Sequence, residues 1–232
     1  MQPDSPLMAQ ATTAITPALA RNRVLRNTYL LLALSMVPTV LGAWLGVSMG
    51  FALFAGHPAI GFLLFMAIAF GFFYGIARTK NSGWGVVLLL AFTFFMGLML
   101  SRMLGVVLGL GNGARLIAMA FGGTAVIFGA MSMIATTTKR DLSGMGKFLT
   151  IGAIVLILAM FANIFLQIPA LMIALSLIAI VVFSGFMLFD VNRIVTGGET
   201  NYITATLAIY LDLYNVFVNL LAILGITGGS ND

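Results

Sequence analysis

Long apolar runs separated by short polar links make up most of the chain. A helix of about 20 predominantly apolar residues is long enough to cross a bilayer. The polar links contain Gly, Pro, Asn, Lys and Arg, which favour turns and helix ends. We therefore predict seven membrane-spanning helices, at about residues 28–48, 57–77, 84–104, 114–136, 148–166, 171–194 and 202–224.

The composition supports this interpretation. Hydrophobic residues make up 61% of the chain and charged residues only 7%, against about 25% charged residues in soluble domains. The predicted fold class is an all-α integral membrane protein, a seven-transmembrane-helix bundle with a central, enclosed seventh helix. We predict three parts: a flexible cytoplasmic tail with a basic end over residues 1–26, a single membrane domain over 27–226 and a short polar tail over 227–232.

The rare residue types exclude several kinds of site. The chain has no cysteine and one histidine, so thiolate metal sites, thiol catalysis and histidine-rich metal sites cannot form. The net charge of +5 does not indicate nucleic-acid binding, because the basic residues lie at span ends rather than on one face. No phosphate-binding loop or catalytic triad order is present. We expect no enzyme activity and no organic cofactor.

The distribution of Lys and Arg predicts the orientation. Three basic residues precede the first span, two follow the second and three lie between the fourth and fifth. Because basic residues accumulate in cytoplasmic links, the N-terminus is predicted to be cytoplasmic. An odd number of spans then places the C-terminus on the periplasmic side. If the seventh helix is enclosed, it need not cross fully, and the side of the C-terminus stays open.

Two carboxylates lie within the last two apolar runs. Asp190 belongs to the sixth predicted span and Asp212 to the seventh, in a chain with only six acidic residues. A carboxylate inside a membrane span is costly, so it faces a partner, a water-filled cavity or a substrate path. Since the link between these two helices is short, we expect them to be antiparallel neighbours. The two carboxylates can then approach each other if the seventh helix starts slightly outside the bilayer, and the sequence leaves open whether they touch.

Polar side chains accompany Asp212 along its helix. Asn215 and Asn219 follow Asp212 at spacings of three and seven residues, which places all three on one helical face. Tyr214 lies beside that face and is predicted to donate a hydrogen bond to a carboxylate. These residues are candidate supporting groups of the site.

Two arginines are candidate partners of the acids. Arg193 follows Asp190 by three residues, a spacing that permits an ion pair on a helix. Arg78, at the end of the second span, is predicted either to reach inward to the acids or to mark the cytoplasmic boundary. Glu199, in the link between the last two spans, is expected to be solvated.

The acids allow two interpretations. Two neighbouring carboxylates at low dielectric do not easily both ionise and would share a proton. That behaviour suits a proton sensor, a cation site such as one for Ca²⁺, or an acid–base pair. Alternatively, Asp190 only pairs with Arg193 while Asp212 only bonds the asparagines. The residues alone leave both open.

Small residues recur at four-residue spacing, a pattern that permits close helix packing. The 26 glycines make chance matches common. We also expect the glycine-rich residues 105–113 to be a loop or a frayed helix end. The candidate packing pairs are Gly42 and Gly46, Gly71 and Gly75, and Gly105 and Gly109.

Several segments resemble the Bax inhibitor-1 family, and in particular its bacterial YccA-like branch. They are ANIFLQIPAL, GGETNYITAT and LYNVFVNLLAILG, together with VLRNTYLLLAL and AMAFGGTAVIF. The resemblance implies seven helices with the last one central, and it implies that Asp190 and Asp212 are the family's aspartate pair. In relatives with a calcium-leak activity this pair is a pH sensor, and Arg78 matches an arginine that can latch to it. Here no acid lies between Asp4 and Asp141, which disfavours a calcium path.

The branch resemblance also implies a bacterial inner-membrane location and partners. It implies a modulator or substrate of the membrane-anchored AAA protease FtsH, working with HflK–HflC, and a flexible N-terminal tail would suit such a protease. We rank this first, with a pH-sensitive switch at Asp190 and Asp212. A pH-sensitive calcium or cation leak gated by the pair is second. An intramembrane aspartyl protease is third, because no glycines surround the second aspartate.

Overall fold

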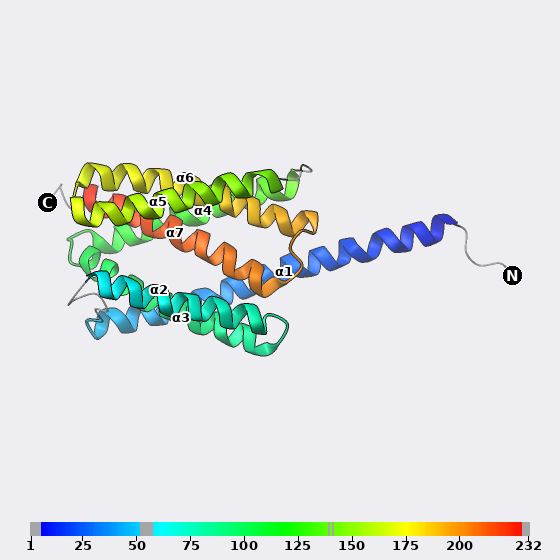
Figure 1. Ribbon diagram of the computed structural model, residues 1–232, viewed down its shortest axis with the longest axis horizontal. Coiled ribbons are helices and arrows are strands. Elements are labelled where there is room, and N and C mark those ends of the chain that lie inside the picture. The colour runs from blue at the N-terminus through cyan, green and yellow to red at the C-terminus, as the bar shows by residue number, and fades with distance from the viewer. Residues whose placement is uncertain (1–5, 52–57, 139, 141, 229–232) are drawn as a thin grey trace.

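The computed structural model describes residues 6–51, 58–138, 140 and 142–228. Throughout these residues the regular structure is helical, and seven helices are long and apolar enough to cross a membrane. They lie roughly along one direction as a bundle (Figure 1). The helices are α1 (Pro6–Ser48), α2 (Pro58–Thr79), α3 (Gly83–Leu108), α4 (Gly113–Thr137), α5 (Ser143–Leu166), α6 (Pro169–Thr196) and α7 (Tyr202–Gly228).

Helix α7 has the most central position. It packs against α1, α2, α3, α4 and α6, whereas the backbone of α5 approaches only that of α6 among the described helices. The share of buried residues in α7 equals that of α3, so α7 is central in its contacts without being the one enclosed helix. The two ends of α7 lie at opposite ends of the bundle (Figure 1). We call the end with the α6–α7 link the basic end, because Arg21, Lys80, Arg140 and Arg193 lie there.

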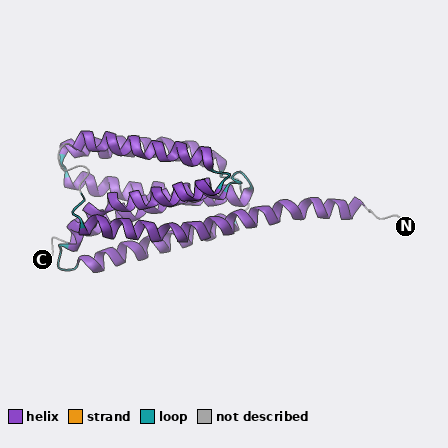
Figure 2. Ribbon diagram, turned by 90° about the horizontal axis from the view of Figure 1, so that it is seen from below, coloured by secondary structure: helices purple, strands orange, loops and turns teal. Residues whose placement is uncertain are grey.

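The N-terminal segment differs from the predicted flexible tail. Helix α1 begins at Pro6, and its first half projects beyond the bundle (Figures 1 and 2). At 43 residues the helix is about 65 Å long. Residues 7–26 are rich in Ala, Leu and Arg, which favour helix, and proline is tolerated at a first helical position. Residues 1–5 lie outside the described part of the chain.

Two other boundaries also differ from the predictions. Helix α3 continues to Leu108, so residues 105–108 are not the expected loop; Val107 is 3% exposed and packs in a cluster with Leu116 and Leu221. This burial outweighs the poor helix propensity of glycine. Helix α7 continues to Gly228, two residues into the predicted polar tail, and residues 229–232 lie outside the description.

Helices α1 and α3 approach each other through glycine. A Cβ atom at Gly42 would collide with the Phe94 carbonyl oxygen, and one at Gly97 would collide with the Thr39 carbonyl oxygen. Gly46 faces Ser101 in the same way. The predicted pair Gly42 and Gly46 is therefore a packing motif. The other two predicted pairs are not, since Gly71 and Gly105 face open space.

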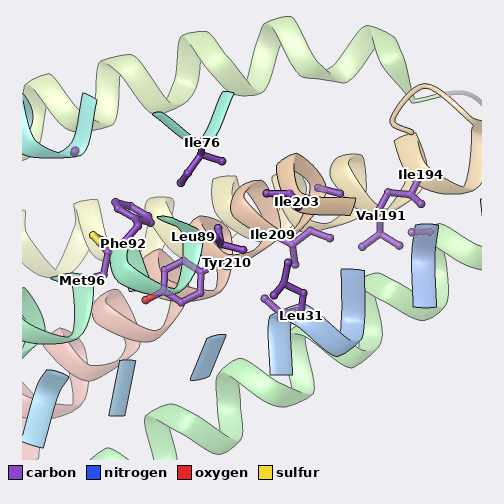
Figure 3. Packing of buried hydrophobic residues seen from close by; sticks show 14 residues of the cluster. Leu31, Ile76, Leu89, Phe92, Met96, Val191, Ile194, Ile203, Ile209 and Tyr210 are labelled. Atoms are coloured by element: carbon purple, nitrogen blue, oxygen red, sulfur yellow. The ribbon is translucent and has the colours of Figure 1, made fainter. Parts of the chain in front are cut away.

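The main core lies between α7, α3 and α1. In it, Tyr210 and Phe92 are each 1% exposed, and their rings meet edge to face (Figure 3). The Tyr210 hydroxyl lies 2.9 Å from the Thr39 hydroxyl and 3.4 Å from the Thr93 carbonyl oxygen. Because an aromatic ring with a satisfied hydroxyl packs and bonds at once, Tyr210 fixes α7 against both helices.

Candidate functional site

The first part of the site is an ion pair on α6, near the basic end. The Arg193 Nη1 atom lies 3.5 Å from the Asp190 Oδ1 atom, as the three-residue spacing predicts. The Asp190 side chain is 11% exposed and that of Arg193 is 39% exposed. The carboxylate therefore lies inside the bundle while its cationic partner reaches the basic end.

The second part is Asp212 on α7, which is 5% exposed. Helices α6 and α7 pack directly, and the carboxyl groups of Asp190 and Asp212 lie near enough to interact with each other. The Asp212 Oδ2 atom is buried without a hydrogen-bond partner among the described residues. A buried carboxyl group left this way is costly, and the local hydrogen bonding therefore does not explain why an acid stands at this position.

The arrangement of the two carboxyl groups limits what they do chemically. Asp190 and Asp212 form a hydrogen bond with each other only when one of them carries a proton, because two carboxylates have no donor. When both are ionised they repel in a low-dielectric environment. Among the described residues, a cationic side chain pairs with Asp190 but not with Asp212. The pair can therefore exist in two states that differ by one proton. In the protonated state the carboxyl groups attract each other, and in the ionised state they push α6 and α7 apart.

The polar residues of α7 do not support Asp212 as predicted. Asn215 donates to the Leu211 carbonyl oxygen at 2.8 Å, and Asn219 donates to the Asn215 carbonyl oxygen at 2.7 Å. Both amides thus bond their own helix backbone. Tyr214 donates to the Met96 carbonyl oxygen of α3 at 3.2 Å rather than to a carboxylate, because its side of α7 faces α3.

Arg78 lies away from the pair. Its Nε atom donates to the Tyr74 hydroxyl at 3.1 Å, and its guanidinium lies 5.6 Å from the centre of the Tyr74 ring. The side chain is exposed. Helix α2 packs on α3 and touches α7 but does not pack on α6. The predicted inward latch is therefore not formed, because α2 is not a neighbour of the helix that carries Asp190.

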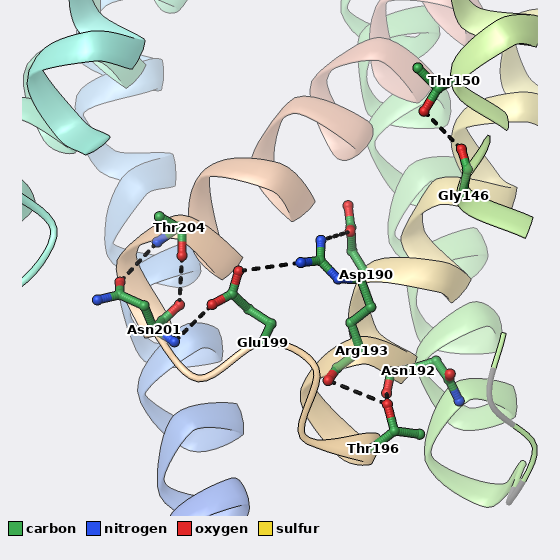
Figure 4. A network of polar contacts seen from close by, with 9 residues as sticks. All are labelled: Gly146, Thr150, Asp190, Asn192, Arg193, Thr196, Glu199, Asn201 and Thr204. Carbon is green, nitrogen blue, oxygen red and sulfur yellow. Dashed lines mark hydrogen bonds and ion pairs between the residues drawn. The ribbon is translucent and has the colours of Figure 1, made fainter. Parts of the chain in front are cut away.

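Glu199 was expected to be solvated, but its side chain is only 21% exposed and pairs with Arg193. Its Oε2 atom lies 3.8 Å from Arg193 Nη2, and its Oε1 atom accepts a hydrogen bond of 2.8 Å from the Asn201 backbone (Figure 4). The Asn201 side-chain oxygen accepts from the backbone amides of Ile203 and Thr204, as an N-cap does. An asparagine just before an apolar helix was the signal that could have predicted this cap.

Asn192, which sequence reasoning missed, holds the α4–α5 link against α6. It is 1% exposed. Its side-chain oxygen accepts from the Leu142 backbone amide at 3.2 Å, and its side-chain nitrogen donates to the Arg140 carbonyl oxygen at 3.2 Å. Near the end of α6, Phe189 contacts α5 and Asp190 contacts α7. Asn192 contacts the α4–α5 link and Arg193 contacts the α6–α7 link.

Replacing Asn192 by alanine is expected to release the α4–α5 link. The Leu142 amide loses its acceptor, so its hydrogen exchange should accelerate by at least about tenfold, the equivalent of about 1.4 kcal/mol. Thr196→Ala is a matched control, because the Thr196 hydroxyl bonds only its own helix backbone. Equal hydrogen-exchange rates of the Leu142 amide in the wild type and in Asn192→Ala would show that the Asn192 side chain does not hold the α4–α5 link.

Calcium binding at Asp190 and Asp212, an option that the sequence leaves open, is not supported by the available ligands. Calcium takes six to eight oxygen ligands. Here two carboxyl groups are accompanied by the Arg193 guanidinium, and among the described residues no three His, Asp or Glu side chains form a group that could hold a metal ion. This donor set does not fit a resident calcium ion.

The comparisons with known proteins place the chain in a family. The family model described as "Inhibitor of apoptosis-promoting Bax1" matches residues 21–229. The chain belongs to the Bax inhibitor-1 family. This membership confirms the resemblance predicted from the sequence segments, and the seven helices confirm the predicted fold class.

Individual relatives within the Bax inhibitor-1 family match over nearly their whole length. The chain is 40% identical over 210 residues to the Escherichia coli K12 protein "Modulator of FtsH protease YccA", covering 90% of this chain and 93% of that protein. The same identity and coverage hold for "Inner membrane protein YccA" of Escherichia coli O6:H1. An "Uncharacterized membrane protein" of Vibrio cholerae is 37% identical over 224 residues, covering 97% of this chain and 98% of that protein.

Proposed function

We propose that this chain is an inner-membrane regulatory protein that modulates a membrane-anchored AAA protease of the FtsH type. The observation that carries the proposal is the 40% identity, over 90% of the chain, to a protein named a modulator of FtsH protease. Sequence identity at this level over nearly the whole of both chains favours a role shared with that protein. The role is one of interaction rather than catalysis, with HflK and HflC as candidate further partners.

The projecting half of α1 is the proposed contact with the protease. It extends beyond the basic end as a single helix (Figure 1). In the orientation predicted by the basic residues this end faces the cytoplasm, where the protease domain of such an enzyme works. A helical arm that projects beyond the bundle can unfold locally at low cost, so a protease can engage it.

The aspartate pair is the proposed switch of this activity. Asp212 is buried beside Asp190, and its Oδ2 atom has no hydrogen-bond partner in the described part of the chain. Because proton binding changes the force between these carboxyl groups, pH would change the packing of α6 on α7. The proposed modulator would thereby adopt different arrangements of α6 and α7 at low pH and at high pH.

The function is tested by co-reconstituting the chain with FtsH from the same bacterium in proteoliposomes. The degradation rate of a fluorescent membrane substrate should fall by about fivefold or more, the lower range of regulatory couplings. A variant that lacks residues 7–18 should lose this effect, since the arm is shortened and the bundle is left intact. A variant in which an Ala- and Gln-rich helix of equal length replaces residues 7–18 separates the role of sequence from that of length.

Unchanged degradation with the full-length chain present would contradict the modulator proposal. Co-purification of HflK and HflC with the tagged chain tests the further partners. Liposomes that contain the chain alone test the alternatives: calcium uptake that depends on Asp212 would favour the leak, and cleavage of a membrane peptide that depends on Asp212 would favour the intramembrane protease.

A further inference from the structure

Arg193 stands between two carboxylates rather than beside one. Its guanidinium lies 3.5 Å from Asp190 and 3.8 Å from Glu199, through different nitrogen atoms. Both distances exceed the roughly 2.7–2.9 Å of a tight charge-assisted hydrogen bond. The guanidinium is therefore shared, and a small rotation of its side chain strengthens one pairing while it weakens the other.

Glu199 belongs to the polar link that follows α6, and its hydrogen bonds couple the Arg193 side chain to the backbone of this link. Its second oxygen accepts from the Asn201 backbone amide at 2.8 Å, and the Glu199 amide donates to the Arg193 carbonyl oxygen at 3.0 Å. The link turns at Gly197, whose φ of 87° is one that residues other than glycine rarely adopt. The segment from Arg193 to Asn201, which contains this turn, is thus tied together at both ends (Figure 4).

Asn201 connects this link to the α2–α3 link, which is 120 residues away in the sequence. Its side-chain nitrogen donates to the Lys80 carbonyl oxygen at 2.9 Å and to the Asn81 side-chain oxygen at 3.0 Å. Its side-chain oxygen caps α7 through the Ile203 and Thr204 amides. A displacement of Glu199 therefore changes the position of Asn201 relative to two other elements at the basic end.

We propose that Arg193 and Glu199 transmit the protonation state of the aspartate pair to the surface of the basic end. When Asp190 and Asp212 are both ionised, Arg193 is drawn to Asp190 and releases Glu199. When the pair holds a proton, Arg193 pairs with Glu199 and fixes the α6–α7 link against the α2–α3 link. Arg193 and Glu199 are positioning residues, and this inference rests on the proposed switch.

We call Arg193 and Glu199 the relay. The other charged groups nearby do not replace Arg193 between Asp190 and Glu199. From α1, Arg21 donates to the Val195 carbonyl oxygen at 3.3 Å and lines, with Glu199, a cavity of about 440 Å³. This second cation near Glu199 gives the released carboxylate an alternative partner. On the side of α5, the Phe189 ring lies 5.5 Å from the Arg193 guanidinium.

Further basic side chains at this end make other contacts or lie on other elements. Lys147 of α5 and Phe189 both line a separate cavity. Arg78 is held by Tyr74. Arg140 and Lys80 contribute their backbone carbonyl oxygens. The described ionisable residues of α3 and α4 are Arg102 and Arg115, which belong to the half of each helix nearer the opposite end of the bundle.

The absence of cysteine from the chain permits a direct test. Cysteines introduced at Ser82 and Thr200, both exposed, carry spin labels on the two links in full-length protein in nanodiscs. Electron–electron distances are measured at pH 5 and pH 9. In parallel, infrared difference spectra follow the carboxyl band that is lost in Asp212→Asn, which reports protonation of the pair independently of the links.

We expect the label distance to change by about 2 Å or more between the two pH values, the scale of helix shifts in switching proteins. Glu199→Gln and Arg193→Gln should remove this change while the carboxyl band still titrates. Arg193→Lys, which keeps the charge, should restore part of it. Lys80→Gln is the matched control, because only the Lys80 backbone is used, and it should behave as the wild type.

A label distance in Glu199→Gln that changes with pH as in the wild type would overturn the relay. So would a wild-type distance that stays constant while the carboxyl band titrates, and in that case the proposed switch itself would stand. A carboxyl band that does not titrate between the two pH values would overturn the switch and the relay together.

Discussion

Replacing Gly97 by leucine is expected to lower the free energy of unfolding of the bundle by about 3 kcal/mol, at the upper end for overpacked cores. A Cβ atom at this position collides with the backbone of α1 at Thr39. Backbone cannot rotate away as a flexible side chain can, so α1 and α3 must separate along their most extensive interface. The change also displaces Thr39 from the Tyr210 hydroxyl, which weakens the attachment of α7.

The measurement is reversible unfolding of the purified protein in bicelles by titration with SDS. Gly71→Leu is the matched control, since the same substitution there faces open space and should change the free energy by less than about 0.5 kcal/mol. Equal effects of the two substitutions would show that the α1–α3 contact is looser than the structure indicates.

Replacing Asp212 by asparagine is expected to raise the free energy of unfolding by about 2 kcal/mol at pH 9, close to the cost of an acid within a span. The wild type buries a carboxylate whose Oδ2 atom has no partner among the described residues and whose neighbour is Asp190. Asparagine keeps the shape and removes both the charge and the repulsion. A gain of this kind at a buried polar position is typical of residues kept for function.

The pH dependence of this gain has a definite sign. The ionised pair is the costly state, so wild-type stability should fall as the pH rises from 5 to 9, while Asp212→Asn should change little. At pH 5 the two proteins should therefore differ less than at pH 9. Asp190→Asn is the matched control. It should gain less, because it also removes the ion pair between Asp190 and Arg193.

An Asp212→Asn protein that is less stable than the wild type at pH 9 would show that Asp212 has a stabilising partner in the membrane. A pH-independent gain would show that the carboxyl group does not titrate over this range. Either result would remove the physical basis for a switch at Asp212, and the measurement needs neither a protease nor an ion gradient.

The number and type of helices could be predicted from hydropathy because a membrane imposes the pattern. Every span must be about 20 residues long and apolar on most sides, so each leaves a clear signal. Boundaries were less predictable. The packing of Val107 extends α3 past Gly105, and α1 continues outward through residues 6–26, because helix propensity does not end where the membrane does.

The partners of the candidate residues were predictable only where both members lie on one helix. Asp190 and Arg193, three residues apart, pair as expected. Tyr214 and Arg78 do not reach the carboxylates, because their partners depend on which helix packs beside them. Helical spacing gives the face of a side chain but not the identity of the element opposite that face.

The sequence by itself determined that this is a seven-helix membrane protein of the Bax inhibitor-1 family with two costly acids in its last two spans. Those features follow from composition, length and local motifs. Only the tertiary structure decided that Asp212 lies beside Asp190 with an oxygen unpartnered, and that Arg193 is shared with Glu199. The physical reason is that these contacts join separate elements, and their distances are set by how α6 packs on α7 and by the turn between them.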